Sequence, residues 1–145
     1  MRNTWIAVAL VAFAVPAFAA DNVGLVKVSK GSVQIQRGAE KLPAPVGAAL
    51  QAKDVIVTGA DGSAGVTFTD NSLVSVGPNS VFAIDKYSFD STTHQGEFEG
   101  NLRQGRLAAI SGKMVKQTPE SMKIRTPSAI MGVRGTEFVV EVAQN

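Results

Sequence analysis

Apolar and polar residues alternate along most of the chain after residue 20, with the period of two that half-buried β-strands show. The segment "SVQIQR", residues 32–37, places Val33 and Ile35 on one face and two glutamines on the other. Three further segments, "SAGVTFTD", "SVFAID" and "GTEFVVEV", repeat the pattern. We therefore expect short strands throughout. The alternation directs these side chains toward a core: Val33, Ile35, Ala64, Val66, Phe68, Phe82, Ile84, Phe138, Val140 and Val142.

Turn-forming residues separate these strands and disfavour helices. The chain contains 14 glycines, each of which costs a helix interior about 1 kcal/mol. Three turn sequences, "DGS" at 61–63, "DNS" at 70–72 and "PNS" at 78–80, follow one another at intervals of 9 and 8 residues. A repeat of strand and turn at this length fits either a meander of hairpins or the rungs of a β-solenoid.

The two arrangements differ in which residues become neighbours. A hairpin reverses the chain at each turn, whereas solenoid rungs stack like residues, with Ser63 near Ser72 and Phe68 near Val76. Each turn is followed by an apolar pair, which favours the stacked arrangement. The prediction is an all-β fold, a β-solenoid or β-roll-like stack of short strands, with a β-sandwich as the alternative.

Three segments depart from the strand pattern. Residues 43–54, "PAPVGAALQAKD", are rich in alanine and predict one helical turn, which Pro45 and Gly47 would limit. Residues 116–123 predict an exposed connection, and the polar residues 88–100 predict a loop.

The first 20 residues, "MRNTWIAVALVAFAVPAFAA", have the pattern of a secretory signal peptide: Arg2, an apolar run, a proline, and small residues around Ala19. A membrane anchor is the alternative, but an anchor needs about 20 apolar residues. We therefore predict a signal peptide at 1–19, cleaved after Ala19. Residues 20–145 are then expected to be a single domain that is periplasmic or secreted.

Composition and charge narrow the possibilities further. Cysteine is absent, so disulfides do not stabilise the domain. Without Arg2, 13 basic minus 12 acidic residues leave a net charge of +1. Residues 54–100 hold seven acidic residues and one lysine, whereas residues 101–136 hold seven basic residues and one glutamate. We expect these two segments to attract each other in the folded chain, the alternative being an electrically polar surface.

Five segments, taken in order, resemble the FecR family domain: "GLVKVSKGSVQIQR" (24–37), "PAPVGAAL" (43–50), "KDVIVTGADGSAGVTFTDNSLVSVGPNS" (53–80), "LRQGRLAAISG" (102–112) and "IRTPSAIMGVRGTEFVV" (124–140). Proteins of that family occur in the bacterial envelope, so the resemblance implies an all-β, solenoid-like envelope domain. It also implies structural roles for the motif residues Asp54, Thr58, Gly59, Gly77, Pro78, Asn79, Thr126, Pro127, Gly132, Arg134, Gly135, Thr136 and Phe138.

The regulators of that family carry a cytoplasmic segment, a membrane helix and a further C-terminal subdomain. A cleavable signal in front of the domain predicts a different organisation here. We expect that this protein does not reach a cytoplasmic sigma factor by itself, and that it does not span the membrane after signal cleavage.

Arg134 is the most conspicuous polar residue of the closing motif, because small and apolar residues surround it. Ala129 and Gly132 would allow close backbone approach there, and Val133 would enter the core. A guanidinium presents five donors in a rigid fork. We hypothesise that Arg134 is partly buried and binds backbone carbonyls or a carboxylate, with Asp54 and Asp70 as candidates. The alternative is an exposed Arg134 that grips an acidic ligand.

The sequence offers little for catalysis or cofactor binding. His94 stands alone in a polar segment, without the cysteines or further histidines that a zinc site needs. Glu97 and Glu99 would share one face of a strand about 7 Å apart, with Phe98 pointing inward. A glycosidase can use such a pair, but a glycine-spaced polar strand is the stronger explanation. We predict no enzyme, no cofactor, no metal and no nucleic-acid partner.

These observations leave two functions of different class. The first is a non-catalytic binding module of the bacterial envelope, which contacts another envelope protein in signalling or assembly. The second is a surface polysaccharide-binding or adhesion protein. A glycan-binding face usually exposes aromatic rings, and these are few outside the signal segment. The first function is therefore favoured.

Overall fold

The computed structural model describes residues 22–133 and 137–143. The predicted signal peptide, residues 1–19, lies outside this part of the chain. The described residues form β1 (Asn22–Lys30), β2 (Val33–Arg37), β3 (Glu40–Pro43), β4 (Ala49–Gln51), β5 (Val55–Thr58), β6 (Ser63–Phe68), β7 (Leu73–Val76), β8 (Val81–Phe89), β9 (Gly96–Ile110), α1 (Lys113–Gln117), β10 (Met122–Arg125), β11 (Ile130–Gly132) and β12 (Glu137–Val142). Within these ranges, no helix is long and apolar enough to cross a membrane.

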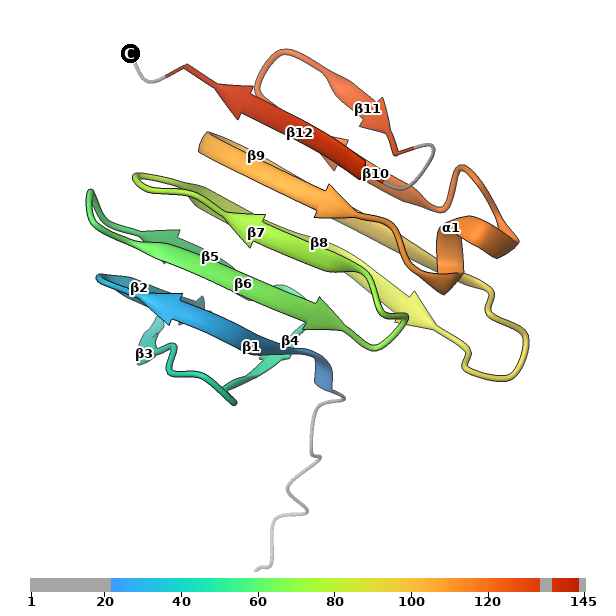
Figure 1. The fold of residues 1–145 in the computed structure, drawn as a ribbon, viewed down its shortest axis with the longest axis horizontal. Coiled ribbons are helices and arrows are strands. Elements are labelled where there is room, and N and C mark those ends of the chain that lie inside the picture. Colours follow the sequence, from blue (N-terminus) through green and yellow to red (C-terminus); the bar gives the residue numbers. More distant parts are fainter. Residues whose placement is uncertain (1–21, 134–136, 144–145) are drawn as a thin grey trace, which may run out of the picture.

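The strands form one curled sheet, a half-barrel whose two halves lie as a front and a back layer (Figure 1). The two halves are joined by the long strand β9. Its first part pairs with β8 and β10, and its last part pairs with β7 and β12. We call the half made of β4, β1, β6, β7, the end of β9 and β12 sheet A. The other half, made of β3, β2, β5, β8, the start of β9, β10 and β11, is sheet B.

The prediction of an all-β fold is confirmed, but the predicted stacking of like residues is wrong. β6 and β7 form an antiparallel hairpin in which Val76 pairs with Ala64 and not with Phe68. Ser63 begins β6 and Ser72 precedes β7, so they lie at opposite ends of the hairpin. The two facing halves resemble the β-sandwich alternative, except that β9 keeps them hydrogen-bonded to each other.

The misleading repeat has a physical cause. The turn sequences look alike but direct the chain to different places in the fold. The turn at Asn71, whose φ is 67°, reverses the chain within sheet A. The turn at Asn79, whose φ is 49°, carries the chain from β7 in sheet A to β8 in sheet B. Both turns need a residue that tolerates the left-handed region, and asparagine does.

The core lies between the two halves, and the strand alternation locates it correctly. Val33, Phe138 and Val142 are half-buried and pack against this core. The other residues predicted to face inward are buried: Ile35, Ala64, Val66, Phe68, Phe82, Ile84 and Val140.

The segment 43–54 contains no helical turn, so that prediction is wrong. Gly47, with φ of 93°, and a turn after Pro45 break the segment, in which Pro43 ends β3 and residues 49–51 form β4. β4 pairs with β1 and so carries the chain from sheet B to sheet A. The predicted loop in 88–100 is confirmed at 90–95.

The acidic and basic segments meet at β9 and β10. There Glu99 is the register partner of Lys123 on one side and of Lys86 on the other. The closest ion pair of the described residues lies elsewhere, between Arg37 and Asp54. Among the described residues, the expected attraction therefore takes the form of this cross-strand row.

Candidate functional site

The outer surface of sheet A carries apolar side chains that remain exposed. Leu25, Val28, Leu73, Ile110 and Val139 are between 39 % and 49 % exposed. They come from β1, β7, β9 and β12. Exposed apolar side chains that gather on one face of a small domain are typical of an interaction site. We call this surface the A face, and it consists of two neighbouring rows of residues.

Two rows of register partners make up the A face, and each crosses β1, β6, β7, β9 and β12 in that order. Direct cross-strand partners lie close together on one side of a sheet. The first row is Leu25, Thr67, Leu73, Ile110 and Glu137. The second row is Val28, Gly65, Ser75, Ala108 and Val139.

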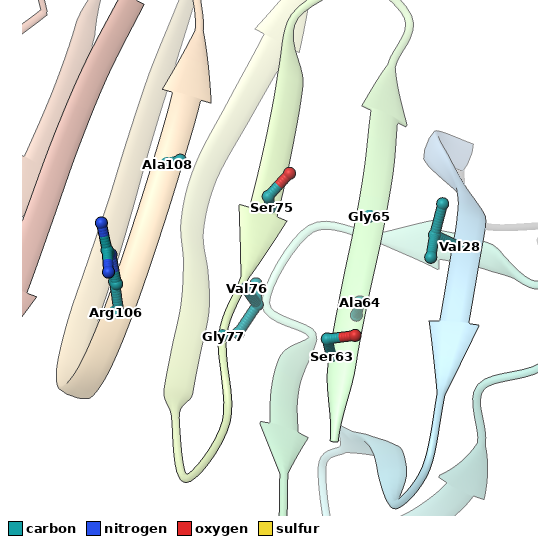
Figure 2. Close-up of a pocket in the computed structure, with 9 residues that line it drawn as sticks. All are labelled: Val28, Ser63, Ala64, Gly65, Ser75, Val76, Gly77, Arg106 and Ala108. Carbon is teal, nitrogen blue, oxygen red and sulfur yellow. The ribbon is translucent and has the colours of Figure 1, made fainter. Parts of the chain in front are cut away.

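The middle of the second row contains only small side chains, and a hollow of about 310 Å³ lies over them (Figure 2). Val28 stands at one end of this hollow, and Arg106 lies toward the other. A larger side chain at position 65 would crowd Val28, because a Cβ added to Gly65 would approach Val28 Cβ at 3.2 Å. The hollow is thus a trough lined mainly by small side chains on the outer side of the curled sheet.

Charged residues lie at the two edges of the A face and carry opposite signs. Lys30 stands on β1, beside its register partner Ser63. Glu137 and Glu141 stand on β12, where Glu141 is the register partner of Arg106. The β1 edge is therefore basic and the β12 edge acidic, with the apolar rows between them.

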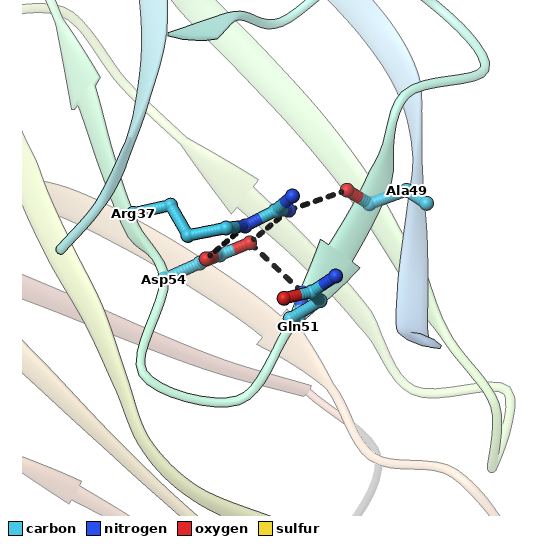
Figure 3. A network of polar contacts seen from close by, with 4 residues as sticks. All are labelled: Arg37, Ala49, Gln51 and Asp54. Carbon is cyan, nitrogen blue, oxygen red and sulfur yellow. Dashed lines mark hydrogen bonds and ion pairs between the residues drawn. The ribbon is translucent and has the colours of Figure 1, made fainter. Parts of the chain in front are cut away.

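Among the predicted motif residues, Asp54 holds an ion pair (Figure 3). Arg37 donates from Nε to Asp54 Oδ1 at 2.9 Å and from Nη2 to Oδ2 at 2.8 Å. The same Nη2 reaches the carbonyl oxygen of Ala49 at 3.2 Å, and the backbone N–H of Gln51 donates to Asp54 Oδ2 at 2.9 Å. Asp54 is 1 % exposed. Its hydrogen bond raises the pKa of Arg37, and the network ties β2, β4 and β5 together.

Thr58 and Gly59 meet the "GPN" turn at one corner of the molecule, where the chain passes between the sheets. Thr58 Oγ1 donates to the carbonyl oxygen of Gly77 at 2.6 Å and accepts from the N–H of Ser80 at 3.0 Å. The N–H of Asn79 donates to the carbonyl oxygen of Gly59 at 3.0 Å. These hydrogen bonds join the segment after β5 to the turn after β7, which is a structural role.

Ser80 extends the same corner to β9. Its Oγ donates to the carbonyl oxygen of Pro78 at 2.9 Å and accepts from the N–H of Arg106 at 3.0 Å. Gly105 passes beside it with φ of 91°. A Cβ at Gly105 would overlap the Ser80 side chain, so only glycine fits this bend.

The closing motif is only partly described. Thr126 and Pro127 lie in the turn between β10 and β11, where the Thr126 N–H donates to the carbonyl oxygen of Ala129 at 2.8 Å. Phe138 is half-buried on β12. Arg134, Gly135 and Thr136 lie outside the described residues, so the hypothesis for Arg134 stays a prediction.

Two expectations for that motif can be compared with its described part. Val133 is buried, as predicted. Gly132, in contrast, has no described atom within 4 Å of the place where a Cβ would stand. The expected close backbone approach at Gly132 is therefore not found among the described residues, where β11 pairs only with β10.

Asp70, the second carboxylate proposed as a partner of Arg134, has hydrogen-bond partners among the described residues. Asp70 accepts from Ser72 Oγ at 2.7 Å and from the N–H of Ser72 at 3.0 Å. The Tyr87 hydroxyl donates to Asp70 Oδ1 at 3.3 Å and lies 2.8 Å from Thr69 Oγ1. Burial is the main cause that raises the pKa of Tyr87 to about 12.

The residues considered for catalysis do not gather into one site. His94 lies in the 90–95 loop and stacks on Phe89 with ring centroids 6.0 Å apart. Glu97 is exposed and Glu99 half-buried on sheet B, with Phe98 buried between them as predicted. The described residues contain no group of three His, Cys, Asp or Glu side chains placed to hold a metal ion.

Sequence reasoning missed the A face, Arg37 and Gly105. The A face is invisible in the strand pattern because "LVSV" and "RLAAI" give no indication of which strands become neighbours. Arg37 is 17 residues from Asp54, and only the pairing of β2 with β5 brings them together. For Gly105, the "RQG" turn signal was available in the sequence.

Comparison with protein families finds one match, in which the model of the FecR protein family covers residues 54–145. Comparisons with curated proteins and with solved structures find no match.

Proposed function

The chain belongs to the FecR family, which is associated with signalling in the bacterial envelope, and from this membership we propose that it is a non-catalytic protein-binding module of the envelope. The binding surface that we propose is the A face. The signal-peptide pattern of residues 1–19 supports export to the periplasm or the cell surface.

The observation that carries this proposal is the pair of neighbouring rows on sheet A, to which four of the five strands contribute exposed apolar side chains. Burying such side chains contributes about 25 cal/mol for each Å² removed from water. Sites for small molecules are usually enclosed and take in most of the ligand's surface. The trough over Ser75 is instead part of the exposed outer side of the sheet, with Val28 and Arg106 toward its two ends. An exposed sheet face with apolar side chains suits another protein surface better than a small ligand.

The same surface argues against the glycan-binding alternative. A sugar ring packs well on an exposed aromatic ring, but the aromatic side chains of the described residues are all buried or half-buried. None of them belongs to the two rows of the A face. These residues are Phe68, Phe82, Tyr87, Phe89, Phe98 and Phe138.

Chemical cross-linking in intact cells tests this function. Ser75 lies in the centre of the A face and Ser88 on sheet B, and both are exposed strand serines. We expect the wild type and Ser88→Arg to form the same protein adducts, and Ser75→Arg to lose them. Adducts that persist in Ser75→Arg, or retention of the protein on envelope glycans instead, would contradict the proposal.

A further inference from the structure

We infer that the A face binds a second copy of this chain, forming a face-to-face dimer with two-fold symmetry. This inference rests on the proposed function, because it names the partner for the same surface. It comes from the order of residue types across the five strands, which is complementary to itself.

The symmetry follows from the strand order. β7 is the central one of the five strands that carry the A face, with β1 and β12 outermost and β6 and β9 between, and β4 continues the sheet only beside the start of β1. A two-fold axis in the interface, parallel to β7, places β1 of one copy over β12 of the other. It also places β6 over β9, and β7 over itself. An interface of this type is isologous, so every contact occurs twice.

This operation brings opposite charges together. It keeps each row over the same row of the second copy, so Lys30 comes over Glu141. Each dimer then contains two such pairs, one at each side of the interface. Charge complementarity fixes the orientation of an interface more than it adds affinity.

The second row also matches under the same operation, because Val28 comes over Val139 and Gly65 comes over Ala108. In the first row Leu73 meets Leu73 of the second copy at the axis, while Leu25 comes over Glu137 at each end. Large side chains therefore meet at the ends of the second row, while small ones in its centre let the sheets approach. Aligned sheets keep their strand directions within about 30° of each other, which preserves this matching near the axis.

The other symmetric arrangement is much less favourable. A two-fold axis across the strands would place β12 over β12 and bring Glu137 over Glu141, which is a repulsion between like charges. It would also remove the attraction between Lys30 and Glu141, because Lys30 would come over Leu25 instead. The residues of the A face thus select one of the two arrangements.

The size of the surface predicts the strength of the dimer. Strands about 4.8 Å apart and about six residues long give five strands a projected area of roughly 500 Å² per copy. A standard interface buries about 800 Å² on each partner. We therefore expect a dimer that dissociates on dilution, which makes its equilibrium accessible to measurement.

Sedimentation velocity of the purified protein over a dilution series is the first test. We expect a concentration-dependent dimer for the wild type and for Ser88→Arg, and a monomer for Ser75→Arg, which places two arginines at the axis. Matching melting curves verify that each variant is folded. A wild type that stays monomeric at roughly 1 mM, where even the weakest specific complexes are partly formed, overturns the inference.

Charge reversal tests the orientation. Lys30→Glu and Glu141→Lys each turn two attractions into two repulsions, and each is expected to raise the dimer Kd roughly tenfold. The double variant Lys30→Glu with Glu141→Lys restores opposite charges and should recover the wild-type Kd. Failure of the double variant to recover overturns the proposed arrangement, because the losses are then not coupled across the interface.

The two tests separate this inference from the proposed function. If the purified protein is monomeric but cross-linking in cells still depends on Ser75, the second-copy inference is wrong and the proposed function stands. If Ser75→Arg changes neither result, both are wrong.

Discussion

Asp54 illustrates how a single residue acts in this protein. A carboxylate that is 1 % exposed needs compensating donors, and Arg37 supplies two of them while the Gln51 backbone supplies a third. The motif residue therefore holds three segments of chain together, which is a structural role in this fold.

The first prediction concerns that pair. Arg37→Ala leaves the buried carboxylate without its cation and is expected to destabilise the fold by about 2–3 kcal/mol. Urea denaturation at constant m-value measures the loss. Arg103→Ala is the matched control, because Arg103 is exposed on β9 and is expected to change stability by less than about 0.5 kcal/mol. Equal midpoints for the two variants would show that the pair does not stabilise the fold.

The second prediction concerns the only tyrosine of the chain. Burial raises the pKa of Tyr87 from 10.0 to about 12. The folded state therefore holds the proton more tightly than the unfolded state, so its stabilising contribution is complete below pH 10 and is lost as the pH rises through about 12. Absorbance at 295 nm should show ionisation near pH 12 in the native protein and near pH 10 in urea. A native midpoint at the urea value would contradict the hydrogen-bonded, half-buried hydroxyl.

The sequence predicted which residues face inward but not which polar residues meet. Alternation is a local property, so Ile35, Phe68 and Phe82 can be placed from their neighbours alone. The contact between Arg37 and Asp54 depends on strand pairing across 17 residues, which alternation does not encode. The hypothesis that offered Asp54 as a candidate partner of Arg134 overlooked Arg37, and its claim for Arg134 stays a prediction.

At the scale of elements, the bend in β9 makes the half-barrel possible. One strand serves both sheets because the chain turns at Gly105, where φ is 91°. Ser80 packs against that bend, and its Oγ accepts a hydrogen bond from the N–H of Arg106. The sequence predicts the turns at Asn71 and Asn79 but not the direction that the chain takes after them. An asparagine with positive φ allows both a hairpin and a crossing between sheets.

The third prediction tests this bend. Gly105→Ala adds a left-handed backbone cost and an overlap with Ser80, and we expect it to destabilise the fold by at least about 3 kcal/mol. Gly38→Ala is the control for backbone cost alone, since Gly38 has φ of 62° and open space around it. Its expected cost is about 1–2 kcal/mol. Thermal unfolding followed by circular dichroism compares them, and equal losses would refute packing at the bend.

At the scale of the whole molecule, the two faces of the curled sheet differ. Sheet B carries a polar row with Lys86, Glu99 and Lys123 side by side. The A face instead carries apolar rows between a basic and an acidic edge. This asymmetry depends on strand order, since its residues come from five strands spread between residues 22 and 142. Family resemblance pointed to the envelope, but only the fold brings a binding surface together.

The central claim is that the A face is covered by a protein partner where the molecule works. The chain has no cysteine, so one introduced cysteine can be followed with a membrane-impermeant maleimide in intact cells. We predict that Ser75→Cys is labelled much more slowly in cells than in the dilute purified protein, whereas Ser88→Cys is labelled at similar rates in both. Equal labelling of the two cysteines in cells would contradict the claim.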